Sequence, residues 1–182
     1  MRQIPWAQLE PVLDLDLGAE VEDVFASFDR TPLAAASIAQ VHAATVDSGE
    51  RVVVKVRRPD IDTVVGWDLD IVDRLAMRLE RSTRWGRGVG AVDLSNGFGD
   101  ALREELDLRI EAQNMTAVRA AAAACGGNGS VRIPKPHQAL CTENVLVMER
   151  LDGRALGTIP ATEEIGDRGA LAARCSTRCS AR

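Results

Sequence analysis

The chain has 182 residues, enough for one domain with a sizeable core, and is 46% hydrophobic and 27% charged. These fractions are typical of soluble globular proteins. The formal net charge of −5 does not indicate bulk binding of nucleic acid. The longest uncharged stretch, residues 31–46, contains proline, glutamine and histidine and is too short to cross a bilayer. We therefore predict no transmembrane segment.

The cysteines show no disulfide framework, and nothing at the N-terminus resembles a signal peptide. A cytoplasmic location is therefore expected. No histidine lies near the last two cysteines in sequence, so no metal site is predicted there. The four cysteines are Cys125, Cys141, Cys175 and Cys179.

The N-terminal part of the chain predicts only short elements. Pro5 and Pro11 interrupt residues 1–18, so at most short helical pieces are expected there. Residues 20–28 carry apolar side chains at i, i+3, i+4 and i+7, which predicts a short packing helix.

Residues 32–59 predict a β-hairpin with one lysine in its second strand. A loop of small residues leads into a first strand, and Asp47-Ser48-Gly49 forms the turn signal, because glycine supplies positive φ. The second strand is a β-branched run, Val-Val-Val-Lys55-Val. A lysine in such a run either snorkels to water or has an anionic partner, and the strand alone does not decide between them.

Two helices are expected next. Residues 60–84 have apolar side chains at near-helical spacing, and residues 85–90 read as a flexible, glycine-rich connection. Residues 93–124 predict one long helix that carries several acidic residues. Its acidic face is explained either by solvation, with Glu105 paired to Arg109, or by a partner for a cation elsewhere.

The remaining chain is less regular. Residues 131–140 are expected to be extended, and residues 145–148 read as a buried strand that leads into a polar, glycine-containing exit. After Gly153 the apolar pattern is lost. We divide the chain into a lobe, residues 1–153, and residues 154–182, which are either the start of a further lobe or a disordered tail.

This order of elements matches the small lobe of a protein kinase with an extra inserted helix. In kinases, a lysine on the third strand pairs with a glutamate on the C-helix and holds the nucleotide phosphates. We therefore predict an α+β fold, an antiparallel sheet with a C-helix, in which Lys55 pairs with Glu111.

At these residues the sequence resembles the UbiB/AarF atypical kinase-like family. The similarity lies in Pro32-Leu-Ala-Ala-Ala-Ser-Ile-Ala-Gln-Val-His42 and in Val-Lys55-Val-Arg-Arg-Pro59. Glu105-Leu-Asp107, followed by Glu111-Ala-Gln-Asn114, is similar to the family's Glu-x-Asp element and C-helix glutamate and asparagine. Val145-Leu-Val-Met-Glu149-Arg-Leu-Asp-Gly153 is similar to its hinge.

The resemblance implies a nucleotide-binding lobe linked to prenyl-quinone or other prenyl-lipid metabolism at membranes. ATP or ADP would be the ligand, with Mg²⁺ in the full-length family, and membrane-associated prenyl-lipid enzymes would be partners of a protein peripheral to the membrane. Lys55 would contact the α- and β-phosphates and Glu111 would orient it. An alanine-rich loop would replace the glycine-rich loop of ordinary kinases, and the hinge would line the adenine. These further residues are Ala34, Ala35, Ala36 and Ser37 in the loop and Met148, Glu149 and Arg150 in the hinge.

The sequence departs from the family in two places. No lysine precedes Lys55, so the family's Lys-x-Gly-Gln element is not found and Glu105 and Asp107 lose their expected partner. No catalytic-loop or Asp-Phe-Gly motif follows Gly153, so the large lobe and its metal ligands are missing and the chain is expected to be catalytically incomplete. A frameshift after Gly153 explains this pattern as a hypothesis, which the downstream DNA in the other frames tests.

Two other interpretations stay open: a non-enzymatic interaction module in which the lysine–glutamate pair is only structural, and a non-functional gene fragment. The histidines do not favour a catalytic triad. His42 is expected to pack within a strand and His137 to lie at the surface.

Overall fold

An antiparallel sheet forms the body of the lobe in the computed structural model, which describes residues 3–124 and 132–153. The strand order is β1-β3-β4-β5, and β2 also pairs with β3. The hairpin of β3 and β4 turns at Gly49, whose φ of 83° explains the glycine. The strands are β1 (Phe25–Phe28), β2 (Ala34–Ala35), β3 (Ala39–Val46), β4 (Arg51–Arg57) and β5 (Val145–Glu149).

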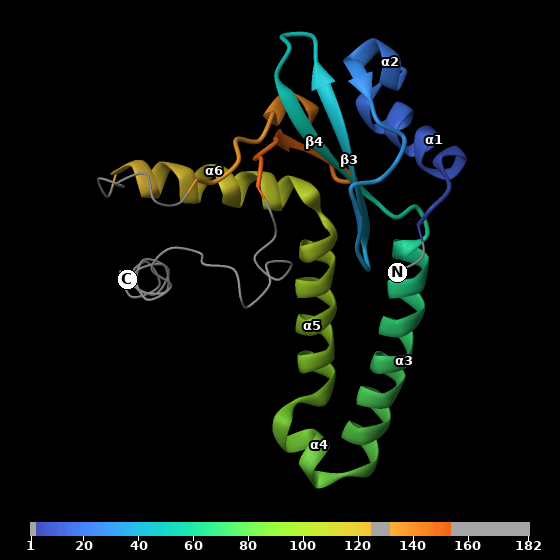
Figure 1. Ribbon diagram of the computed structural model, residues 1–182. Coiled ribbons are helices and arrows are strands. Elements are labelled where there is room, and N and C mark those ends of the chain that lie inside the picture. The colour runs from blue at the N-terminus through green and yellow to red at the C-terminus, as the bar shows by residue number, and fades with distance from the viewer. Residues whose placement is uncertain (1–2, 125–131, 154–182) are drawn as a thin grey trace, which may run out of the picture.

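Different helices cover the two faces of this sheet (Figure 1). The side chains of a strand alternate between faces, so Val52, Val54 and Val56 of β4 lie together in the larger core. That core is completed by α1 (Trp6–Leu17) and α2 (Val21–Val24). On the opposite face, α6 (Leu108–Ala124) packs its Leu108 and Ala112 against Leu146 of β5.

The N-terminal predictions were partly wrong. Residues 6–17 form one continuous helix although Pro11 lies inside it. Pro11 is exposed, while Leu9 and Leu13 are fully buried, so packing on the sheet outweighs the lost backbone hydrogen bond. The predicted helix over residues 20–28 ends at Val24, because Phe25–Phe28 pairs with β3 as an edge strand.

A long helical hairpin projects from one end of the sheet (Figure 1). It consists of α3 (Ile61–Ser82), α4 (Arg84–Val89) and α5 (Ala91–Leu106). Residues 85–89 are therefore helical, and the flexible connection predicted over residues 85–90 is wrong except at Gly90, which ends α4. Thr83 caps α4 by accepting the N–H of Gly86 at 2.9 Å. Gly86 packs so tightly on α3 that a Cβ there would lie 2.4 Å from the carbonyl oxygen of Leu79.

The helix predicted over residues 93–124 is wrong in its continuity. It begins at Ala91 and breaks at Asp107, which has extended backbone angles of φ −82° and ψ 103°. The Asp107 carboxylate accepts the N–H of Arg109 at 2.9 Å, and the N–H of Leu108 donates to the carbonyl of Glu143 at 3.0 Å. These bonds replace helical ones, so the chain turns and α6 lies across the sheet (Figure 1).

The segment before β5 is extended, as predicted, except for a short 3₁₀ turn, η1 (Gln138–Leu140). Pro136 forms a bridge to Met148 beside β5. The predictions for residues 154–182 lie outside the described residues, as do those for Cys125, Cys175 and Cys179.

Candidate functional site

The Lys55 ammonium and the Glu111 carboxylate form an ion pair on the α6 side of the sheet. The Nζ of Lys55 lies 2.7 Å from Oε2 of Glu111. The lysine side chain is 20% exposed and the glutamate side chain 42% exposed, so the pair is partly desolvated but open to an incoming ligand. The structure thus brings together the two residues that the sequence paired, while their role in binding stays a prediction.

The position of Lys55 follows from the two-residue period of β4. Val54 and Val56 point to the core with α1, so Lys55 between them must point to the α6 face. On that face it lies opposite Leu146 of β5 in the strand register. Because α6 packs on Leu146, it carries Glu111, next to the buried Ala112, to the lysine.

The alanine-rich segment forms a tight turn at the start of β3. Ala34 and Ala35 make β2, which pairs with Val41 and Gln40. The N–H of Ala36 donates to the carbonyl of Ala39 at 2.8 Å, so Ala36 and Ser37 are the exposed tip of this turn. Its described residues have no positive φ, which is what a turn without glycine requires.

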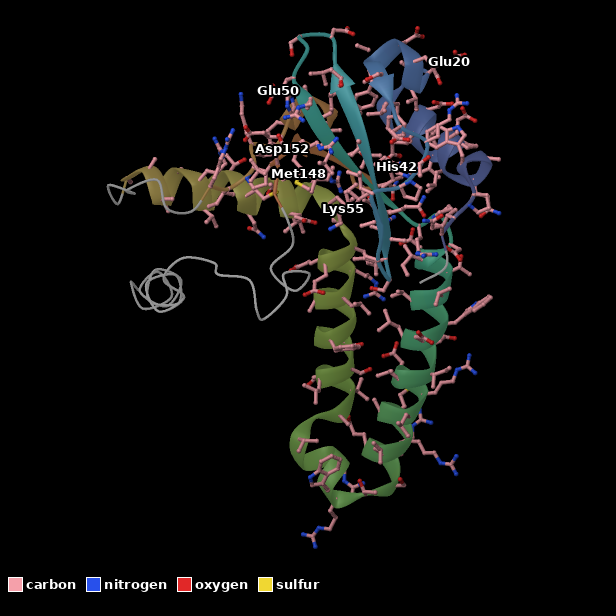
Figure 2. The ribbon with its side chains drawn as sticks, in the orientation of Figure 1. Glu20, His42, Glu50, Lys55, Met148 and Asp152 are labelled. Carbon is pink, nitrogen blue, oxygen red and sulfur yellow. The ribbon has the colours of Figure 1, made fainter. Side chains whose placement is uncertain are left out.

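The hinge-like residues follow from β5. Met148 is opposite Val53 in the register, so its side chain lies on the same face as Lys55, against the α6 cluster (Figure 2). The Glu149 side chain binds Arg132, and its N–H donates to the carbonyl of Lys135 at 2.8 Å. The N–H of Arg150 donates to the carbonyl of Arg51 at 3.0 Å. Of the three, Met148 is the one that packs against the cluster of α6 on the lysine's face.

The acidic element lines a groove of about 650 Å³ at the junction of α5 and α6. Its carboxylates come from Glu104, Glu105, Asp107 and Glu111. Ile110, Met115 and Val118 are among its apolar walls. The alternative pairing of Glu105 with Arg109 is wrong, because Arg109 binds Asp107 at 2.7 Å and Glu143 at 3.4 Å. Its hydrogen bond to Asp107 holds the pKa of that carboxyl below the usual range.

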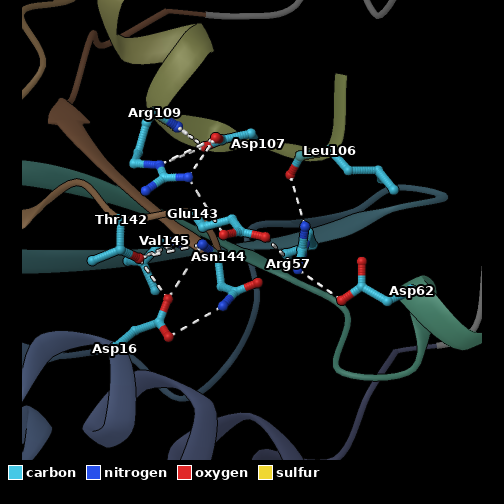
Figure 3. Close-up of polar contacts among 10 residues, drawn as sticks. All are labelled: Asp16, Arg57, Asp62, Leu106, Asp107, Arg109, Thr142, Glu143, Asn144 and Val145. Carbon is cyan, nitrogen blue, oxygen red and sulfur yellow. Dashed lines mark hydrogen bonds and ion pairs between the residues drawn. The ribbon is translucent and has the colours of Figure 1, made fainter. Parts of the chain in front are cut away.

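Sequence reasoning missed Arg57, which joins the sheet to the helical hairpin of α3 and α5 (Figure 3). Its side chain is 7% exposed, and its guanidinium donates to the Leu106 carbonyl at 3.1 Å and to Asp62 at 2.7 Å. It also lies 3.6 Å from Glu143, which lies 3.4 Å from Arg109. Arg57 therefore holds the first turn of α3 and the end of α5 at once. The available signal was its position two residues after Lys55, which puts both side chains on one face.

A second polar cluster fixes the start of β5 to α1 (Figure 3). Asp16 accepts the Thr142 hydroxyl at 2.5 Å and the Asn144 side-chain amide at 3.1 Å. The Thr142 hydroxyl oxygen in turn accepts the N–H of Val145 at 3.0 Å. The strand that carries Met148 is thus anchored before it enters the sheet.

His42 is fully buried and packs on Phe28, as predicted for a packing residue. The side-chain oxygen Oε1 of Gln40 accepts the backbone N–H of Ile4 at 2.8 Å. The side-chain nitrogen Nε2 of Gln40 therefore faces His42 Nε2 at 3.1 Å. Nε2 is then the acceptor, and Nδ1–H donates to the Asp29 carbonyl at 2.9 Å. Burial lowers the pKa of His42, although the Asp29 bond opposes this.

His137 and Cys141 are both only partly exposed, so the surface position predicted for His137 is wrong in degree. The His137 side chain is 20% exposed, with Nε2 3.4 Å from a Glu50 carboxylate oxygen. The Cys141 thiol donates to the His137 carbonyl at 3.3 Å, and burial raises its pKa. A thiol with a raised pKa is a poor nucleophile, which favours packing over chemistry.

The family comparison decides the identity of this lobe. The family model described as the ABC1 atypical kinase-like domain matches residues 1–181. The chain belongs to this family. The ABC1 assignment accounts for the α+β small-lobe fold, with its strand lysine and helix glutamate on one face of the sheet.

Curated proteins with this domain are similar over most of the chain. An uncharacterized protein of Mycobacterium tuberculosis H37Rv, Rv0647c, is 42% identical over 167 residues, which are 90% of this chain and 34% of that protein. A probable protein kinase UbiB from Marinobacter nauticus is 36% identical over 162 residues, 89% of this chain and 29% of that protein. A probable protein kinase UbiB from Pseudomonas aeruginosa PAO1 is 39% identical over 151 residues, 83% of this chain and 27% of that protein. The chain therefore spans about a third or less of these relatives.

A solved structure supports the same fold. The complex of Rv3197 with erythromycin from Mycobacterium tuberculosis matches with a TM-score of 0.68 and 31% identity. The match covers 82% of this chain and 36% of that chain.

Within residues 3–124 and 132–153, no helix combines the length and apolar character that a bilayer crossing needs.

Proposed function

We propose that this lobe binds an adenine nucleotide, ATP or ADP, as the small lobe of an ABC1/UbiB-type atypical kinase or ATPase. Lys55 would contact the α- and β-phosphates, and Glu111 would hold the lysine in place. The exposed turn at Ala36 and Ser37, with β2 behind it, would lie over the phosphates, and Met148 would contact the adenine from the hinge. The Lys55–Glu111 ion pair carries the proposal.

The chemistry of the described residues fits a nucleotide. A phosphate chain needs a fixed cation, and Lys55 is one of only two lysines in the chain. Its side chain is 20% exposed and lies on the face that also carries the Met148 side chain, an apolar neighbour suited to a flat base. The nucleotide would bring Mg²⁺ as the counter-ion of its phosphates. What this chain supplies is the ammonium group and the carboxylate that orients it.

The wider role follows from the family and belongs to the same proposal. We infer a link to prenyl-quinone or lipid metabolism through membrane-associated enzymes, supported by the UbiB names of the relatives. Because the chain covers 27–34% of the relatives' length, phosphoryl transfer is not assigned to residues of this chain.

Thermal unfolding in a titration with ATP and Mg²⁺ tests the proposal. At a nucleotide concentration about 100-fold above the Kd, mass action adds about 2.7 kcal/mol of stability. For a chain of this size that raises the Tm by roughly 5–10 °C. Lys55→Ala should weaken binding by about tenfold to 100-fold, since hydrogen bonds to charged groups contribute about 1.5–3 kcal/mol.

Lys135→Ala is the matched control, because it removes the only other lysine of the chain. It should keep the wild-type response to nucleotide. The Tm of each variant without nucleotide separates a lost contact from lost folding. A wild-type Tm that does not respond to ATP or ADP would contradict nucleotide binding and favour an interaction module or a non-functional fragment. Capture of a specific partner protein separates those two.

A second ligand is suited to the same titration. The Rv3197 protein of the matched structure is in complex with erythromycin. We propose erythromycin as the alternative ligand for this chain, supported by the TM-score of 0.68. A rise in Tm with erythromycin that Lys55→Ala leaves unchanged would show a site separate from the lysine.

A further inference from the structure

The outer side of α3 carries a stripe of exposed apolar side chains. Trp67 is 68% exposed, Ile71 64% and Leu75 56%, and Val64 at the start of the stripe is 41% exposed. Their spacing of three to four residues puts them on one side of the helix, opposite the buried Leu69 and Ala76. A stripe of this kind, about 16 Å long, is typical of a helix that packs on another helix.

The charges along α3 are separated end to end. Residues 60–73 contain five aspartates and no basic residue, and residues 74–82 contain three arginines and one glutamate. With its N-cap Asp60, this helix therefore has a formal charge of −5 in the half near the sheet and, by three minus one, +2 in the half near the hairpin tip. The apolar stripe crosses the boundary, with Val64 and Trp67 in the acidic half and Leu75 in the basic half.

This pattern selects one kind of partner. A uniformly anionic surface, such as a bilayer of acidic lipids, would attract the arginine half but repel the aspartate half around Trp67. A second copy of α3 running antiparallel places each acidic half beside a basic half, and both stripes are then covered.

We propose that the chain forms a symmetric dimer in which α3 pairs antiparallel with α3 of a second copy. Ile71 lies at the two-fold axis, because Trp67 and Leu75 are each four residues from it. Trp67 of one copy then lies at the level of Leu75 of the other, and the arrangement is self-complementary. A single 22-residue helix offers a contact about 33 Å long, so the dimer is of the small, weak class with a micromolar Kd.

Sedimentation of the full chain across the micromolar range tests the dimer. The wild type should shift from monomer to dimer with concentration, and more weakly at high salt. Ile71→Arg places two like charges at the axis and should raise the Kd at least about tenfold. Leu94→Arg is the matched control, because Leu94 is 69% exposed on α5 rather than on the stripe, and it should dimerise as the wild type does.

Charge reversal makes the test specific. One variant combines Arg74→Glu with Arg81→Glu, and the other combines Asp60→Arg with Asp68→Arg. Asp62 and Asp73 are spared, because they bind Arg57 and Ser95. Each variant alone should be monomeric, and an equimolar mixture should form a heterodimer, since both charged contacts are then restored. The Tm of each variant confirms folding.

Four outcomes overturn the proposal. One is a wild type that stays monomeric across the range, and another is a dimer that Ile71→Arg leaves intact. The third is a mixture of reversed variants that remains monomeric although both are folded. Binding of the monomer to phosphatidylglycerol vesicles, lost in Ile71→Arg, would also overturn it by assigning the stripe to a membrane.

Discussion

Replacing Arg57 by methionine should destabilise the lobe far more than the loss of an ordinary surface ion pair. The Arg57 side chain is 7% exposed, and its hydrogen bond to the Leu106 carbonyl is buried. Methionine keeps much of the apolar stem but leaves that carbonyl without its donor, which costs about 1–3 kcal/mol. Asp62 and Glu143 are 61% and 51% exposed and return to water, so their loss adds only about 0–1 kcal/mol each.

The expected total is about 1–5 kcal/mol. At roughly 2–4 °C per kcal/mol for a chain of this size, the Tm should fall by about 2–20 °C. The Tm of Arg57→Lys should lie between those of the wild type and Arg57→Met, because an ammonium keeps the positive charge but lacks the planar guanidinium that reaches two acceptors at once. Differential scanning calorimetry or circular dichroism measures these shifts.

Arg74→Met is the matched control for this experiment. Arg74 binds Asp70 at 2.7 Å with both side chains at least 65% exposed, so about 0.3–0.5 kcal/mol is expected. A Tm change for Arg57→Met no larger than that of Arg74→Met would refute the idea that one buried guanidinium holds the hairpin to the sheet.

Two further predictions concern pH and the hairpin tip. Because the pKa of His42 is lowered on folding, its contribution to stability is complete above the ordinary pKa of 6.5 and is lost as the pH falls toward the folded pKa. The Tm of the wild type should thus fall on acidification below about pH 6.5, while the Tm of His42→Gln should fall less. Equal slopes for the two proteins would contradict this. Gly86→Ala should lower the Tm, because its Cβ would lie 2.4 Å from the Leu79 carbonyl oxygen. Gly97→Ala, whose Cβ would have nothing within 4 Å, should raise the free energy of unfolding by up to about 1 kcal/mol. A higher Tm for Gly86→Ala than for Gly97→Ala would show that the helical hairpin relaxes freely at Gly86.

The sequence was sufficient to predict the sheet elements whose signals are local. The valine run and the Asp-Ser-Gly turn specify β3 and β4, and the run of four apolar residues specifies β5. The pairing of Lys55 with Glu111 was also predictable, because a half-buried ammonium requires an acid and the kinase resemblance points to that helix. The fold class and family follow from these elements.

The elements that were wrong depend on contacts distant in sequence. Periodicity alone makes residues 25–28 helical, but their strand conformation is set by pairing with β3. Pro11 lies inside α1 because Leu9 and Leu13 are buried against the sheet. The break at Asp107 requires the carbonyl of Glu143, which is 35 residues away from Leu108 in sequence. No local pattern contains that partner.

The break at Asp107 also explains how the site is built. If α5 continued straight, Glu111 would lie more than a full turn further along α5 instead of crossing the sheet beneath Lys55. The turn is held by Glu143, which contacts Arg109 on one side and Arg57 on the other. Arg57 and Lys55 share a face because they are two residues apart on β4. Strand β4 therefore carries both Lys55, which Glu111 binds, and Arg57, which contacts the Glu143 that holds the turn into α6. The geometry of the Lys55–Glu111 ion pair depends on Arg57 as much as on the helix propensity of α6.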